Sequence, residues 1–270
     1  YVSNLMEAYP EKILGWAESF WQDAYLKAPQ DSRSHWRLHD LRRPQPPVVK
    51  TNTLPCKFTA APEDAVILIG DGEEKGAFKG DNLRLWSMKE GVLTASGQTN
   101  NRISSEYAFD DVHVHLEFRT PSPVRGHGQR RGNSGLFLMG LYEVQILDSY
   151  ENPTYTDGQM AALYGQSPPL VNASRRPGEW QCLDVIFTPP QFSDGKLTAP
   201  ARATVLHNDI VAQANAAFTG PTQFASNPPY APHATKLPLT LQDHGDRGSR
   251  ISFRNMWARP LAPTTEMKPK

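Results

Sequence analysis

The sequence has few cysteines, no excess of charge and no long apolar run. Its two cysteines, Cys56 and Cys182, are too few for a disulfide-rich scaffold. They either form one bridge or remain two buried thiols. The 28 basic residues balance the 28 acidic ones, so charge gives no reason to expect binding to nucleic acid. No apolar run approaches the roughly 18 residues of a membrane-spanning helix, and we expect no membrane span.

Signal peptides and common catalytic signatures are also absent from this chain. It starts at Tyr1, which suggests a trimmed bacterial protein of the periplasm or the medium whose signal segment is missing here. The pattern Gly126-x-Gly128 is not followed by a helical pattern, so it does not indicate a nucleotide site. We find no Ser-His-Asp or Cys-His arrangement, and Cys182 has no activating neighbours.

Residues 1–60 differ from the rest of the chain. Apolar residues recur at spacings of three and four between Pro10 and Lys27, which predicts one helix. Its apolar stripe is expected to pack on the outside of the main domain, or to join two copies in a homo-oligomer. The polar, proline-rich stretch from Ser34 to Pro55 predicts an extended arm along the surface. We interpret His35 and His39 in it as surface histidines rather than metal ligands.

Residues 61–262 show the pattern of an all-β domain, and 263–270 that of a short tail. Short alternating runs recur at close spacing, no helical pattern appears after residue 60, and the chain is rich in proline and glycine, with 24 and 19 residues. In residues 111–119, Val112, Val114, Leu116 and Phe118 are expected to face a core. Together these features favour a two-sheet β-sandwich over a parallel α/β sheet.

Polar residues occupy the other face of that same run. His113, His115, Glu117 and Arg119 alternate with the apolar positions. Two histidines two residues apart with a carboxylate can bind a divalent metal from a strand, although a solvated stripe is the commoner outcome.

The stretch from Gly132 to Asp148 is the strongest candidate for a functional site. It predicts two short strands separated at Gly140. In the second strand Glu143 and Gln145 share one face, opposite the apolar residues, and a bulge would turn Asp148 toward Glu143. A carboxylate and an amide on a sheet face beside glycines are typical either of a sugar-binding site or of an ordinary solvated face.

Five short motifs recur in order between Asp64 and Pro260, and together they resemble the 3-keto-disaccharide hydrolase domain family. The motifs are Asn133-Ser134-Gly135 with Glu143-Val144-Gln145-Ile146-Leu147-Asp148, then Ala162-Leu163-Tyr164-Gly165, Pro177-Gly178-Glu179-Trp180, Leu241-Gln242-Asp243-His244-Gly245 and Phe253-Arg254-Asn255. The resemblance implies an all-β, concanavalin A-like jelly-roll β-sandwich, here with an N-terminal helical extension. It also implies a carbohydrate substrate.

The resemblance implies chemistry on 3-keto-glycosides. A ketone at C3 acidifies the hydrogen at C2, so a base removes that proton, the enolate expels the C1 substituent and water adds to the product. We expect the catalytic residues to be Glu143, Asp148, His244 and Arg254. The expected substrate-binding residues are Arg119, Asn133, Gln145, Tyr164 and Gln242. Either Glu143 or His244 is the base. Arg254, or a divalent metal ion as the one cofactor considered, holds the enolate.

Two other functions remain open. The run from Glu143 to Asp148 is similar to the catalytic strand of laminarinase-type retaining glucanases, in which two acids flank a third. Here Gln145 stands where the middle acid would be, which weakens that interpretation. The same fold also serves as a non-catalytic, lectin-like carbohydrate-binding module.

Overall fold

The structure is a computed structural model that describes residues 29–30, 34–50, 59–72, 77–246 and 248–261. In these ranges it is an all-β protein, whose helical turns are the short 3₁₀ segments η1 (Asp81–Leu85), η2 (Gly128–Arg130) and η3 (Thr156–Gly158). The helix expected over residues 10–27 lies outside the described residues. No described helix is long and apolar enough to cross a membrane.

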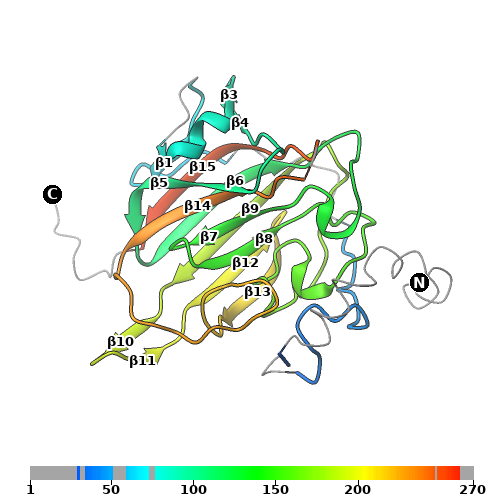
Figure 1. Cartoon of the computed structure of the whole chain (residues 1–270). Coiled ribbons are helices and arrows are strands. Elements are labelled where there is room, and N and C mark those ends of the chain that lie inside the picture. The colour runs from blue at the N-terminus through cyan, green and yellow to red at the C-terminus, as the bar shows by residue number, and fades with distance from the viewer. Residues whose placement is uncertain (1–28, 31–33, 51–58, 73–76, 247, 262–270) are drawn as a thin grey trace.

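Two antiparallel sheets make up the domain and lie one over the other (Figure 1). Eight strands form the larger sheet, in the order β13-β12-β9-β6-β15-β4-β3, with β1 paired to β15. Their bounds are β1 (Val66–Ile69), β3 (Ser87–Lys89), β4 (Val92–Thr94), β6 (Val112–Arg119), β9 (Trp180–Thr188), β12 (Arg202–His207), β13 (Ile210–Ala217) and β15 (Ser252–Pro260).

Five strands form the smaller sheet, in the order β2-β5-β14-β7-β8. Their bounds are β2 (Phe78–Lys79), β5 (Asn101–Phe109), β7 (Ser134–Leu138), β8 (Tyr142–Ile146) and β14 (Leu237–Asp243). A separate hairpin, β10 (Gln191–Ser193) with β11 (Lys196–Ala199), projects beyond the two sheets (Figure 1). This hairpin and the two-residue β2 have no clear signal in the sequence, and neither was expected from it.

The core between the sheets follows the alternation expected from the sequence. Val114, Leu116 and Phe118 of β6 and Tyr142 and Val144 of β8 are fully buried and belong to one apolar cluster. The expected two-sheet arrangement is therefore present and is consistent with a jelly roll. Because these residues face inward, every second residue of β8 faces outward, which places Glu143 and Gln145 on the outer face of the smaller sheet.

The N-terminal arm packs against the loops after β8 instead of merely lying on the surface. Val49 donates a backbone hydrogen bond to the carbonyl of Asn172 at 2.9 Å, and the Gln45 amide donates to the carbonyl of Thr154 at 2.6 Å. His39 is only 5% exposed, so our interpretation of it as a surface histidine was wrong, whereas His35 is exposed as expected. The reason is local: an aspartate and several aromatic rings from the later loops enclose His39.

Cys182 lies on the outer side of β9, in the larger sheet, and is disulfide-bonded. The alternative of a free buried thiol therefore does not hold for this residue. Cys56 lies outside the described residues.

The assignment of Leu116 to the inward face of β6 can be tested by measuring the stability of variants. Leu116 is 0% exposed between the sheets, and Leu197 on β11 is 41% exposed. We expect Leu116→Ala to lower the free energy of unfolding by about 2–5 kcal/mol through lost burial and the cavity left behind. Leu197→Ala should change it by no more than about 0.5 kcal/mol. Denaturant unfolding of the two variants measures this, and equal effects would contradict the assigned strand faces.

Candidate functional site

The outer face of the smaller sheet carries an ordered set of polar side chains. The register pairs Glu143 with Phe137 and Gln145 with Gly135 across β7 and β8. Leu241 pairs with Leu136, so Gln242 lies across from Gly135 on the other side of β7. Gly135 therefore stands in the middle of this face, with polar residues on both sides.

The lack of a side chain at Gly135 makes room for the Glu143 carboxyl group. A Cβ atom at Gly135 would collide with Oε1 of Glu143 and would lie 2.9 Å from the Phe137 ring. Glu143 thus bends over β7 instead of extending into solvent, and it is only 6% exposed. The glycine of the Asn133-Ser134-Gly135 motif is required here by a close approach of side chains.

Glu143 differs from the other buried acids of the described residues. Each of the others accepts a hydrogen bond from another residue; they are Asp40, Glu117, Asp148, Asp157 and Asp243. The Glu143 side chain has no hydrogen-bond partner among the residues that the structure describes. Burial raises the pKa of Glu143 to about 8, and the charge of Arg102 offsets only part of that shift. The carboxyl group is therefore protonated at neutral pH.

Arg102 supplies the positive charge near Glu143. It projects from β5 next to Gln242 of β14, and its guanidinium carbon lies 3.7 Å from the centroid of the Phe137 ring. This cation–π contact holds the guanidinium over the sheet face.

Asn133 and Gln145 are held by a network of amide groups from η2. Asn133 donates through Nδ2 to the carbonyl oxygen of Gln129 at 2.7 Å, and Gln145 donates through Nε2 to Oδ1 of Asn133 at 3.2 Å. Oε1 of Gln145 is buried and has no partner among the described residues. A buried acceptor without a donor is uncommon, and here it stands on the same face as Glu143.

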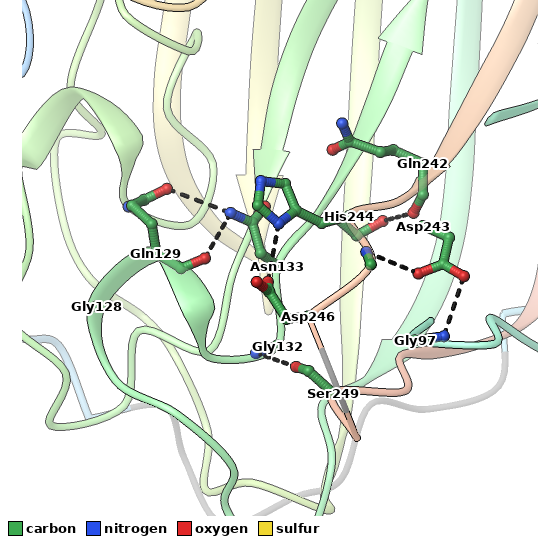
Figure 2. A network of polar contacts seen from close by, with 12 residues as sticks. Gly97, Gly128, Gln129, Gly132, Asn133, Gln242, Asp243, His244, Asp246 and Ser249 are labelled. Carbon is green, nitrogen blue, oxygen red and sulfur yellow. Dashed lines mark hydrogen bonds and ion pairs between the residues drawn. The ribbon is translucent and has the colours of Figure 1, made fainter. Parts of the chain in front are cut away.

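His244 and Gln242 extend this face at the end of β14 (Figure 2). The His244 imidazole donates through Nδ1 to Oδ2 of Asp246 at 2.8 Å, and its Nε2 points away from Asp246. In the neutral imidazole this hydrogen bond leaves the lone pair on Nε2. Asp243 fixes the backbone just before His244, because its carboxylate accepts hydrogen bonds from Ser96 and from the amide of Gly97. The Gln242 carboxamide makes no hydrogen bond to another described residue.

Tyr164 completes the set on the far side of Glu143. Its backbone amide donates to the carbonyl of Glu143 at 3.2 Å. Its hydroxyl lies 2.8 Å from that of Tyr155, and the Tyr164 side chain is partly exposed. The structure thus brings together Glu143, Gln145, Asn133, Gln242, His244 and Tyr164 along one face.

Arg254 and Arg119 do not belong to this face, and our expectation that they would join Glu143 does not hold. They lie on β15 and β6 of the larger sheet, where both guanidinium groups stack on the Trp180 ring. Arg254 also donates to Oε2 of the buried Glu117 at 2.6 Å. The physical reason is the sandwich itself, since residues pointing outward from opposite sheets lie on opposite sides of the domain.

The Asp148 carboxylate does not turn toward Glu143, because other residues hold it in place by hydrogen bonds. Its carboxylate accepts a hydrogen bond from Nε of Arg131 at 2.7 Å and one from the backbone of Tyr150 at 3.3 Å. A depression of about 480 Å³ lies at this loop, lined in part by Arg131, Tyr150 and Arg176. We base the site on the Glu143 face because the converging polar groups are there.

The polar stripe on β6 forms hydrogen bonds within the sheet. Nε2 of His113 and Nδ1 of His115 each lie 3.0 Å from Oδ1 of Asp184. This contact lowers the pKa of Asp184 to about 2, although burial acts in the opposite direction. Within the described ranges, no group of three or more histidine, cysteine, aspartate or glutamate side chains is arranged to hold a metal ion.

Sequence reasoning missed two contributors to the site, namely Arg102 and Asp246. Asp246 had a local signal, because it follows His244 by two residues. Arg102 had none, since it reaches the site through sheet pairing.

Comparisons with known proteins identify the family of this chain and agree with its fold. The model of the 3-keto-alpha-glucoside-1,2-lyase-like domain matches residues 67–259. A presumed glycosyl hydrolase from Parabacteroides distasonis ATCC 8503 is 39% identical, with a TM-score of 0.72 over 82% of this chain and 94% of that one. A second from the same organism is 22% identical, with a TM-score of 0.52 over 72% and 98%, and shows the fold alone. A search of curated proteins finds no match.

The family match spans well over half of the chain, and it includes β8, which carries Glu143, and β14, which His244 directly follows. The chain therefore belongs to the family of 3-keto-alpha-glucoside-1,2-lyase-like domains.

Proposed function

We propose that this protein is a carbohydrate-active enzyme of the glycosyl hydrolase type that cleaves 3-keto-glycosides. The family match supports action on a keto-sugar, and the relative at 39% identity is itself described as a presumed glycosyl hydrolase. The reaction begins with removal of the proton at C2, continues with loss of the C1 substituent and ends with addition of water.

One observation carries this proposal. Two ionisable groups stand on one sheet face in different environments, a protonated Glu143 without a hydrogen-bond partner among the described residues and a His244 whose Nδ1 is held by Asp246 and whose Nε2 makes no hydrogen bond to a described residue. A carboxyl group that keeps its proton beside an imidazole with one nitrogen available is suited to acid and base roles in one reaction. Hence His244 is the base, and Glu143 is the acid.

The proton and electron movements follow from these roles. Nε2 of His244 takes the C2 proton, and the C–H electron pair moves toward C3, placing negative charge on the C3 oxygen. The electrons then return to form a C1–C2 double bond, and the C1–O bond breaks. Glu143 gives its proton to the departing oxygen. Water adds across the double bond, with its hydroxyl on C1 and its proton on C2.

Retaining glucanase chemistry has less support. It requires two carboxyl groups about 5–5.5 Å apart, one of them an ionised nucleophile. In this protein Gln145 occupies the position between Glu143 and Asp148, and Asp148 is paired with Arg131. A binding module with the same fold would need neither the protonated Glu143 nor the oriented His244.

The substrate class can be tested with two glucosides that carry deuterium at C2. We expect cleavage of the 3-keto-glucoside with loss of the label to solvent, and no cleavage of the parent glucoside. Without the ketone the C2 hydrogen is beyond the reach of a histidine base. Mass spectrometry of the products reads both results. Cleavage of the plain glucoside with retention of the label would favour the glucanase, and binding without cleavage of either would favour the module.

The acid role of Glu143 predicts a dependence on the leaving group. Glu143→Gln should lower kcat about 10²-fold or more for a methyl 3-keto-glucoside and far less for a 4-nitrophenyl one, which departs without a proton. In the wild type, kcat/KM for the methyl substrate should fall as pH rises through about 8, because the ionised carboxylate has no proton to give. Equal losses on both substrates would instead make Glu143 the base.

The base role of His244 predicts the complementary pattern. His244→Ala should lower kcat by about 10²–10⁴-fold for both leaving groups, because C2 deprotonation precedes departure in either case. His35→Ala is the matched control, since His35 is exposed on the arm, and it should leave kcat unchanged. The rate of C2 exchange in deuterated water measures the step directly, and undiminished exchange in His244→Ala would exclude His244 as the base.

A further inference from the structure

The proposed reaction places negative charge on the C3 oxygen, and the structure offers a group to hold it. Arg254, our first expectation, is on the opposite side of the sandwich. Tyr164 lies directly beside Glu143, because the segment around it pairs with the free edge of β8. Leu163 bridges Val144, and the amide of Gln145 donates to the carbonyl of Ala162 at 2.9 Å. Since Leu163 faces the core, Tyr164 faces outward like Glu143.

A second tyrosine stands behind Tyr164. Tyr155 is only 5% exposed, and its hydroxyl lies 2.8 Å from the Tyr164 hydroxyl. This is the single hydrogen bond of the Tyr155 side chain to a described residue. A buried hydroxyl normally donates its proton, so Tyr155 is the donor and Tyr164 the acceptor in this pair. The proton of Tyr164 is then free to be donated outward.

The Tyr155 ring is held firmly in place. The His39 ring of the N-terminal arm lies 4.2 Å from it, centroid to centroid, and a Cβ atom at Gly158 would collide with its edge. The backbone amide of His39 donates in turn to Oδ2 of Asp157 at 2.9 Å. A fixed donor behind Tyr164 leaves little reorganisation for the moment of reaction, which is the condition for effective stabilisation of a developing charge.

We propose that Tyr164, oriented by Tyr155, donates the hydrogen bond that stabilises the enolate oxygen at C3 when His244 removes the C2 proton. No proton is transferred in this contact, and the C3 oxygen regains its double bond as the C1 substituent leaves. Tyr164 is a catalytic residue in this proposal and Tyr155 a positioning residue. The inference rests on the proposed function and adds the hydrogen-bond donor that stabilises the negative charge on the C3 oxygen.

The protonation of both phenols agrees with this role. Burial raises the pKa of Tyr155 and of Tyr164 above the usual value, and nearby Asp157 acts in the same direction. Both hydroxyls therefore keep their protons over the working range of the enzyme. The hydrogen bond from Tyr155 also polarises the Tyr164 hydroxyl and strengthens it as a donor.

The test compares Tyr164→Phe, Tyr155→Phe, the double variant and the control Tyr107→Phe, whose side chain is 51% exposed on β5. With the 3-keto-glucoside, Tyr164→Phe should lower kcat about 10²–10³-fold, as expected for loss of one donor to an oxyanion. Tyr155→Phe should lower it about tenfold. The double variant should match Tyr164→Phe, because Tyr155 acts only through Tyr164. Tyr107→Phe should behave as the wild type.

Binding of the plain glucoside separates this role from a merely structural one. That ligand lacks the ketone, so its dissociation constant should stay within about twofold in all four variants. Circular dichroism and melting curves confirm folding, and the partly exposed Tyr164 carries the test if Tyr155→Phe is unstable.

Three results would overturn the proposal while leaving the proposed function intact. The first is a kcat of Tyr164→Phe within about threefold of the wild type. The second is a fall in the kcat of the double variant equal to the product of the falls in the two single variants. The third is wild-type activity that a chelator abolishes and a divalent ion restores. If the wild type itself does not cleave the 3-keto-glucoside, the proposed function fails first, and all variants will be equally inactive.

Discussion

A carboxyl group folded over a glycine is the constraint on which the site depends. Glu143 occupies the space that a side chain at Gly135 would fill, where it is only 6% exposed and has no hydrogen-bond donor from the described residues. An ionised carboxylate without a partner is unfavourable in such a place, so the group holds its proton to about pH 8. The neighbouring residues surround this carboxyl group, with Arg102 stacked on Phe137 on one side and Tyr164 on the other.

The other buried acids show what the same fold does when a charge is structural. Glu117 is paired with Arg254, Asp148 with Arg131, and Asp243 accepts from Ser96 and from the amide of Gly97. Each is compensated by a nearby donor, as buried charges generally are. The contrast with Glu143 distinguishes groups that stabilise the sheets from the group whose proton is available for chemistry.

The N-terminal arm is part of this arrangement although it precedes the sandwich in the sequence. It brings His39 against the Tyr155 ring and Gln45 against the loop that carries Thr154 and Gln159. The loops after β8 thus pack between the sheet and the arm. These contacts on two sides hold the long segment without regular strands that carries Tyr155 and Tyr164.

The sequence alone determined the alternation of the strands, and with it the core of the sandwich. Val114, Leu116, Tyr142 and Val144 were assigned correctly because a period of two is a local property of the chain. The same local rule placed Glu143 and Gln145 on one outer face. The glycine of the Asn133 motif was also visible in the sequence, although its purpose was not.

Only the tertiary structure decided which outward residues meet. Arg254 and Glu143 both point away from the core, but they extend from opposite sheets, and no local pattern records the sheet to which a strand belongs. Arg102 and Tyr155 reach the Glu143 face through pairing and loop packing across long sequence separations. Local periodicity fixes the direction of a side chain relative to its own strand, whereas its neighbours in space depend on contacts that form only when the whole chain folds.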